Sequence, residues 1–158
     1  MPDPFRIVVL ISGSGTNLQA LIDRIHVPSR DARIVLAGWM SILTGAFLDR
    51  FPDRVINLHP SLLPAFPGMH AIDDALAWGV RFTGVTVHFA EEEVDGGPPI
   101  LQEPVPVYVG DTPESLAERV HAAEHRVLPD AVRLFIDGRV WRDPQSPRKV
   151  HILEEGQL

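Results

Sequence analysis

The chain has 158 residues, of which 45% are hydrophobic and 22% charged, as expected for one globular domain with a buried core. It contains no cysteine, which excludes disulfides, thiolate catalysis and zinc–sulfur sites. The formal net charge of −7 argues against nonspecific binding to nucleic acid. The sequence shows neither a signal-peptide pattern nor an apolar run long enough to span a membrane, so we expect a soluble cytoplasmic protein.

The first half of the chain alternates strand and helix patterns. Residues 5–12 form a compact β-branched run typical of a buried strand, and a glycine turn leads into a helix over 15–25. Strands are predicted at 33–39 and 54–58, with a short helix at 45–51 between them. This order predicts an α/β domain.

The second half continues with a helix at 73–79 and a strand at 84–90, followed by an extended segment at 99–107. Two prolines confine that segment to a sheet edge. A long helix over 112–138 begins with Thr112 as N-cap and Pro113 at the first helical position, and Pro129 is expected to kink or split it. A short strand is predicted at 139–143, and the tail from 144 shows no clear pattern.

The loop SGSGTN, residues 12–17, follows the first strand and opens a helix. Backbone N–H groups at such a helix start favour anions, and Thr16 and Asn17 add side-chain donors. The loop is neither a Walker A motif nor a full dinucleotide fingerprint, because Leu18 occupies the place of the third glycine. A phosphate site and a plain strand-to-helix turn are therefore equally open.

Asn57 and His59 lie at the carboxyl end of a predicted strand. Strand alternation places both side chains on one face. Open α/β sheets commonly bind ligands at the carboxyl ends of their strands. Three prolines and a glycine follow within nine residues, in the stretch HPSLLPAFPG. Such stiffening favours a histidine held still for proton transfer over one that only satisfies loop backbone.

The segment EEEVDGGP, residues 91–98, is most simply a solvated edge followed by a turn. Its functional interpretation is that Gly96 and Gly97 bring Asp95 close to a histidine. A carboxylate beside an imidazole raises the pKa of the imidazole and makes an acid–base pair. On the long helix, His121, Glu124 and His125 share a face, but no HExxH motif is present and an exposed polar face is the preferred interpretation.

Several long strings together resemble the phosphoribosylglycinamide formyltransferases, folate-dependent enzymes of purine synthesis. The strings are VVLISGSGTNLQALI, VLAGWMSIL, INLHPSLLPAFPGMHA, GVTVHFAEEEVDGGPPILQEPVPV and GDTPESLAERVHAAEHRVLP, in the same order as in the family, over about residues 5–140. The resemblance implies a three-layer Rossmann-like α/β fold, with a mostly parallel sheet that has an antiparallel edge portion. It also implies a single formyltransferase domain over residues 1–158.

The resemblance implies transfer of a formyl group from 10-formyltetrahydrofolate, used as co-substrate without a metal, to the amine of 5′-phosphoribosylglycinamide. Asn57, His59 and Asp95 are then the catalytic residues, with His59 kept charged near neutral pH by Asp95. The ribonucleotide phosphate and glycinamide are assigned to Gly15, Thr16, Asn17, His121, Ala122, Ala123 and Glu124. Folate is assigned to Arg30, Met40, Ser41, Ile42, Leu43, Asn57, Glu91, Glu92, Glu93, Val94 and Asp95. We further expect the Leu63–Pro64 bond to be cis, no nucleic-acid or membrane partner, and a monomer or homodimer.

Two departures from the family stand out. Ser41 replaces an arginine that is common there, which removes a positive contact with folate. Only residues 26–32 separate the first predicted helix from the second strand, where the family carries two further strand–helix units. Either segments near 25–33 are missing from the sequence as read, or the chain is truly shortened and exposes a sheet edge.

Other functions stay open beside formyl transfer. A formyltetrahydrofolate deformylase uses a similar site on water, but it carries a further regulatory domain and lacks the proline after the site histidine. A methionyl-tRNA formyltransferase has a further tRNA-binding domain and a more basic surface. A remnant that binds folate or a nucleotide without turnover is the non-catalytic alternative.

Overall fold

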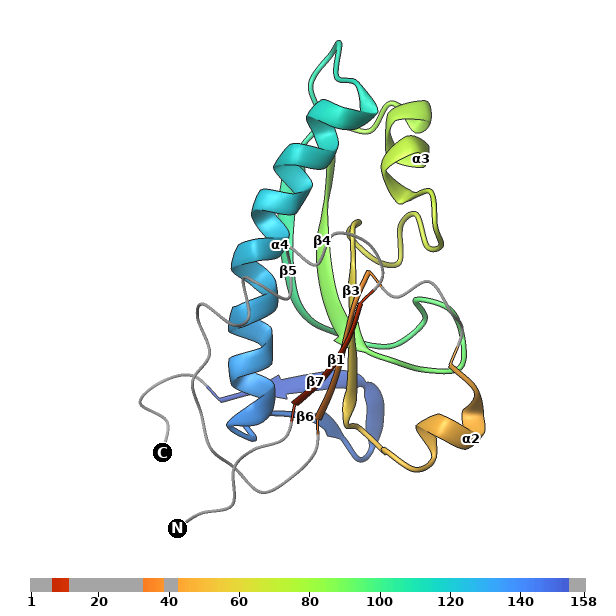
Figure 1. The fold of residues 1–158 in the computed structure, drawn as a ribbon, viewed down its shortest axis with the longest axis vertical. Coiled ribbons are helices and arrows are strands. Elements are labelled where there is room, and N and C mark those ends of the chain that lie inside the picture. The colour runs from red at the N-terminus through yellow and green to blue at the C-terminus, as the bar shows by residue number, and fades with distance from the viewer. Residues whose placement is uncertain (1–6, 12–32, 39–42, 154–158) are drawn as a thin grey trace.

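A computed structural model of the chain describes residues 7–11, 33–38 and 43–153 (Figure 1). Its strands and helices are β1 (Ile7–Ile11), β2 (Arg33–Ala37), α2 (Gly45–Leu48), β3 (Val55–His59), α3 (Ala71–Trp78), β4 (Phe82–Phe89), β5 (Pro99–Pro106), α4 (Pro113–Ile136), β6 (Val140–Asp143) and β7 (Ser146–Ile152). In this described part of the chain, no helix is long and apolar enough to cross a membrane.

Five strands form one mixed sheet in the order β1-β2-β3-β4-β5. The ladders β1–β2 and β2–β3 are parallel, whereas β3–β4 and β4–β5 are antiparallel. The parallel strands and the antiparallel edge portion agree with the fold that the resemblance implies. As predicted, the proline-containing strand β5 lies at the edge of this sheet. Proline has no N–H to donate, and at an edge no neighbouring strand needs that donor.

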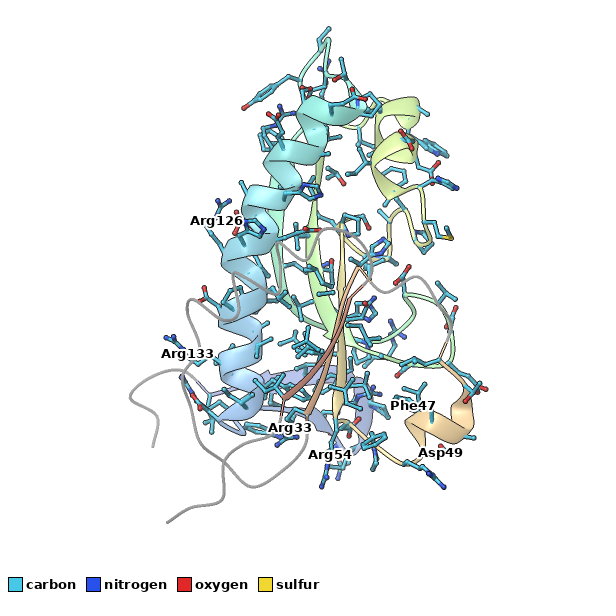
Figure 2. All side chains as sticks on the ribbon, in the orientation of Figure 1. Arg33, Phe47, Asp49, Arg54, Arg126 and Arg133 are labelled. Carbon is cyan, nitrogen blue, oxygen red and sulfur yellow. The ribbon has the colours of Figure 1, made fainter. Side chains whose placement is uncertain are left out.

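The two faces of the sheet are covered differently. Helix α4 runs along one face (Figure 1), and its apolar side packs on the inward residues of β3 and β4, with Phe135 meeting the Phe89 ring edge-on at 6.0 Å. On the other face, Val55 packs with Phe47 of α2, which points toward the sheet in Figure 2. Because Ile56 and Leu58 belong to the α4 side, strand alternation places Asn57 and His59 on the side of α2.

Helix α4 begins as the sequence predicts, with Thr112 accepting from the Ser115 N–H and Pro113 in the first turn. The expectation that Pro129 splits the helix is wrong, because α4 is continuous over its 24 residues. Pro129 is itself buried, and the helix buries apolar residues on both sides of it. That packing outweighs the roughly 3 kcal/mol that an internal proline costs.

A second, two-stranded sheet follows α4, and the tail without a clear pattern contributes one of its strands. Strands β6 and β7 form an antiparallel hairpin, in which Val140 pairs with Ile152 and Arg142 with Val150. Val140, Val150 and Ile152 pack against the main core, and Arg139 bonds back to Leu153 to close the hairpin. The strand predicted at 139–143 is present as β6, over Val140–Asp143, but the sequence does not predict its partner, since SPRKVHI lacks the alternation that marks a strand.

Candidate active site

Asn57 and His59 lie on one face of the sheet, as their spacing predicts, and it is the face opposite α4. The antiparallel register pairs Asn57 with His88 and His59 with Thr86. Since paired residues in a ladder project to the same face, these four polar side chains form a compact group at the end of β3. His59, Thr86 and His88 are buried, and Asn57 is partly buried.

The carboxylate of Asp95 joins this group from the loop after β4. Its Oδ1 accepts from Asn57 Nδ2 at 3.3 Å, and its Oδ2 lies 3.3 Å from His59 Nδ1. The backbone N–H of Gly68 also donates to Oδ2, at 2.8 Å. The structure thus brings together the three residues that the sequence singled out.

Gly97 makes the approach of Asp95 possible. A Cβ on this residue would lie 1.7 Å from the carbonyl oxygen of Phe89, so the returning chain packs closer to β4 than any other residue allows. Asp95 itself adopts a positive φ of 53°, which is uncommon outside glycine. The expectation that the glycines bring Asp95 to a histidine therefore has a structural basis.

His88 belongs to the same network and was left without a role by the sequence analysis. Its Nδ1 donates to the carbonyl of Phe89 at 2.8 Å, so Nε2 accepts from Asn57 Nδ2 at 3.2 Å. Nε2 also lies 3.7 Å from Asp95 Oδ1. The side-chain alternation of β4 places His88 on this face, but only the strand register, which the sequence does not state, places it opposite Asn57.

The proline-rich loop after β3 is fastened to β4 and β5. The Thr86 hydroxyl donates to the Ser61 carbonyl at 2.7 Å and accepts from the Leu63 N–H at 3.1 Å. Gln102 bonds both the Leu63 carbonyl and the Thr86 hydroxyl, and the expected cis bond at Leu63–Pro64 is present. This loop delivers the Phe66 carbonyl, which accepts from His59 Nε2 at 2.8 Å.

Burial lowers the pKa of His59 below its usual 6.5, and the Phe66 carbonyl and the Asp95 charge, which raise it, do not offset this. The expectation that Asp95 keeps His59 charged near neutral pH is therefore wrong for this arrangement, although Asp95 acts in the expected direction. Burial raises the pKa of Asp95, but a hydrogen bond from the His88 ring when it is protonated, the Gly68 N–H and the charge of a protonated His59 together bring this pKa below its ordinary value. Asp95 is thus an ionised partner for any proton that His59 takes up.

The residues assigned to folate are only partly described. Leu43 packs against the buried residues Ile34, Leu36 and Val55. Glu91 is half-buried, whereas Glu92, Glu93 and Val94 are exposed. Two of the residues assigned to folate, Glu91 and Glu92, line a cavity of about 300 Å³. Its lining residues are Gly45, Leu48, Asp49, Phe51, Pro52, Asp53, Val55, Ala90, Glu91, Glu92 and Arg142.

The helical part of the predicted ribonucleotide site lies on α4. Ala123 and Glu124 are buried, whereas His121 and Ala122 are exposed. This helix covers the face of the sheet opposite Asn57 and His59, so the two groups are not one cluster of side chains. The other assigned residues, Gly15, Thr16, Asn17, Arg30, Met40, Ser41 and Ile42, lie outside the described residues.

The part of the chain that the structure describes contains no group of three or more histidine, aspartate or glutamate side chains that could hold a metal ion. The face shared by His121, Glu124 and His125 is therefore not a cluster of that kind, and the side chain of Glu124 is buried rather than solvated.

Comparison with known proteins identifies the family. A model of the formyl transferase family matches residues 31–132. The chain belongs to the formyl transferase family. A phosphoribosylglycinamide formyltransferase of Escherichia coli is 35% identical, with 88% of this chain and 94% of that protein aligned. Their alignment covers 199 positions, more than this chain has residues, so it contains gaps.

Two further matches agree with this assignment. A crystal structure of glycinamide ribonucleotide transformylase 1 from Symbiobacterium toebii has a TM-score of 0.86 at 40% identity, with 96% of this chain and 95% of that chain covered. A trifunctional purine biosynthetic protein of Gallus gallus is 48% identical over 81% of this chain. This chain spans only 13% of that relative's length, and 19% of the corresponding bovine and human proteins.

Proposed function

We propose that the protein transfers a formyl group from 10-formyltetrahydrofolate to the amine of 5′-phosphoribosylglycinamide. The observation that carries this proposal is the network in which Asp95 bonds Asn57 and lies beside His59, at the end of a strand in a formyl transferase. The E. coli relative that aligns over nearly its whole length is named a phosphoribosylglycinamide formyltransferase, which supports the acceptor and the group transferred. The folate acts as co-substrate and needs no metal.

Formyl transfer forms a C–N bond to the glycinamide amine, breaks the C–N bond to the folate and moves one proton between the two nitrogens. The glycinamide amine attacks the formyl carbon, and the carbonyl oxygen becomes an oxyanion in a tetrahedral intermediate. Collapse breaks the bond from the formyl carbon to the folate nitrogen, which receives the proton that the amine loses. A covalent intermediate with the enzyme is not needed, in keeping with the absence of cysteine.

His59 is suited to the proton transfer because it is neutral in its buried setting. Its Nε2 carries the hydrogen given to the Phe66 carbonyl, so a new proton enters at Nδ1, beside the Asp95 carboxylate. The resulting imidazolium is stabilised by that charge and can return the proton. Asn57 supplies an amide donor for the oxyanion if one of its two hydrogens turns from His88 or Asp95 toward the substrate.

The substrates are assigned as the family resemblance implies. We propose that Gly15 to Asn17 bind the ribonucleotide phosphate and that His121 to Glu124 also contact glycinamide ribonucleotide. We propose the folate at Arg30, Met40 to Leu43, Asn57 and Glu91 to Asp95. The loss of a positive contact at Ser41 is expected to weaken folate binding. We further propose a cytoplasmic monomer or homodimer whose partners are small molecules.

The test is an assay of the purified protein with both substrates, following formylated glycinamide ribonucleotide by mass spectrometry. His59→Ala should lower turnover by at least about a hundredfold, the usual contribution of an acid–base group. His151→Ala is the matched control, because His151 is exposed on the outer face of the β6–β7 hairpin. Near-normal turnover in His59→Ala would remove His59 from the mechanism.

The same assay separates the alternatives. Release of formate without formylated product would indicate a deformylase-like hydrolase. Binding of either substrate without any turnover would indicate the non-catalytic remnant. Both outcomes contradict the proposed transfer.

A further inference from the structure

The β6–β7 hairpin presents two arginines toward the body of the protein. Val140 is 7% exposed and packs into the core, and Val150 and Ile152 pack there from the opposite strand. Since side chains alternate along a strand, Arg142 projects to the same side as Val140, and Arg148 to the same side as Val150. The hairpin therefore anchors itself with aliphatic residues and extends two cations beyond them.

Both arginines reach the segment that carries Asp95, which we call the Asp95 loop (residues 91–97). Arg142 Nη1 donates to Glu91 Oε1 at 2.6 Å, at the start of this loop. Arg148 Nη1 donates to the Gly96 carbonyl at 3.0 Å, one residue after Asp95. The hairpin thus contacts the loop at both ends, although 51 and 52 residues separate the partners in the chain.

Arg142 is held in place independently of the loop. Its guanidinium lies over the ring of Phe89, 5.0 Å from the centroid, and its Nε lies 2.9 Å from Asp53 Oδ1 as an ion pair without hydrogen-bond geometry. Its side chain is only 17% exposed. Arg142 is therefore held by contacts outside the Asp95 loop, and it can fix the position of Glu91.

The Asp95 loop has little apolar burial of its own to fix it. Glu92, Glu93 and Val94 are exposed, and a Gly96 N–H to Glu93 carbonyl bond closes the turn. Asp95 sits in this turn with its positive φ. Its carboxylate lies 3.3 Å from both Asn57 Nδ2 and His59 Nδ1 and accepts from the Gly68 N–H, so contacts at the loop ends can add to its positioning.

We propose that Arg142 and Arg148 are positioning residues that hold the Asp95 carboxylate against His59 by fixing both ends of the Asp95 loop. This inference deepens the proposed function and rests on it for the catalytic role of Asp95. A misplacement of about 1 Å at a catalytic group can lower a rate a hundredfold. The Arg148 contact is exposed, and the two carboxylates paired with Arg142, Asp53 and Glu91, are 55% and 34% exposed and can be hydrated once Arg142 is replaced. Removal of these contacts should therefore act on the rate while the fold persists.

The experiment uses the full chain with Arg142→Met and Arg148→Ala combined. Methionine keeps an unbranched side chain over Phe89 and removes both ion pairs. We expect kcat for formyl transfer to fall about tenfold or more, with the thermal midpoint nearly unchanged. In an NMR titration the pKa of His59 should fall, because Asp95 raises it and moves away.

Lys149→Ala is the matched control, since it removes an exposed cation adjacent to Arg148 on the outward face. Arg148→Lys retains a donor for the Gly96 carbonyl and should restore most of the activity lost in Arg148→Ala. If the combined variant does not fold, the single variant Arg148→Ala tests the inference, because loss of this exposed side chain should leave the fold intact. It should then lower kcat several-fold with the same direction of change in the His59 titration.

A combined variant with kcat within twofold of the wild type and an unchanged His59 titration would overturn the inference. An equal loss in Lys149→Ala would do so too, since it would indicate a general effect of charge. If the wild type transfers no formyl group, the proposed function fails. The His59 titration, which needs no substrate, still decides whether the hairpin positions Asp95.

Discussion

Two buried threonines on β4 provide a sharp test of the hydrogen-bond network behind the site. Thr86 is 0% exposed, and its hydroxyl bonds the Ser61 carbonyl, the Leu63 N–H and Gln102. Thr83 is 1% exposed, but its hydroxyl has no hydrogen-bond partner among the described residues. Replacement of each by valine removes one hydroxyl at nearly constant shape, in opposite hydrogen-bonding contexts.

Thr86→Val leaves two buried backbone groups unsatisfied, namely the Ser61 carbonyl and the Leu63 N–H. Each costs about 1–3 kcal/mol, so the free energy of unfolding should fall by about 3 kcal/mol. For a chain of this length that lowers the thermal midpoint by roughly 6–12 °C. Thr83→Val should be neutral or stabilising, because it replaces a buried hydroxyl that already lacks a partner.

Urea denaturation of both variants and the wild type, with a common m-value, measures these free energies directly. Turnover adds a second readout, since the Thr86 hydroxyl fastens the loop that carries the Phe66 carbonyl to His59. Thr86→Ser, which keeps the hydroxyl, should lie near the wild type in turnover. Equal destabilisation by Thr83→Val and Thr86→Val would refute the reasoning, because it would show that the bonding of the hydroxyl does not matter.

Four further predictions concern the site and the chain. Asp95→Asn should lower the pKa of His59 and reduce turnover at neutral pH; an imidazole titration that does not move would contradict the pairing. Because the pKa of His59 is lower in the folded than in the unfolded state, its contribution to stability is complete above about pH 6.5 and is lost as the pH falls below it. The unfolding free energy of His59→Gln should therefore decline less steeply than that of the wild type from pH 7.5 to 5.5, and parallel declines would count against this. Thr16→Ala with Asn17→Ala should mainly raise the KM for glycinamide ribonucleotide, so a change confined to folate affinity would show that the phosphate is placed wrongly. An intact mass several kilodaltons above 17.5 kDa is expected if segments near residues 25–33 are missing from the sequence, whereas 17.5 kDa would establish a truly shortened chain.

Local chemistry explains which parts of the fold the sequence could predict. The capping of α4 by Thr112 and the end of α3 at Gly79, with φ 69°, depend on neighbouring residues only. The continuity of α4 through Pro129 depends on burial against the sheet, which a local rule for proline does not contain. The second strand of the hairpin was missed for a similar reason, since β7 is held by its pairing with β6 and by the core beneath it.

In the site, too, local sequence predicts some features and the assembled fold sets others. Alternation put Asn57 and His59 on one face, and the glycines after Asp95 indicated its approach. The positions of His88 and Gln102 follow instead from the register of three strands, which pairs His88 with Asn57 and aligns His59, Thr86 and Gln102 in one row. The direction of the His59 pKa shift also escaped the sequence, because burial outweighs the Asp95 charge and burial is a property of the assembled fold.

The stiff loop after His59 has a function that its residues alone do not reveal. It delivers two backbone groups to the network, the Phe66 carbonyl to His59 Nε2 and the Gly68 N–H to Asp95 Oδ2. Phe66 has a positive φ of 51°, and such a conformation in a phenylalanine persists only where the surrounding structure fixes it. Prolines on either side supply part of that constraint, and the bonds from Thr86 and Gln102 supply the rest. Because both groups come from one rigid segment, His59 and Asp95 are aligned by the same piece of backbone, and a shift of that segment would change the proton affinity of both partners together.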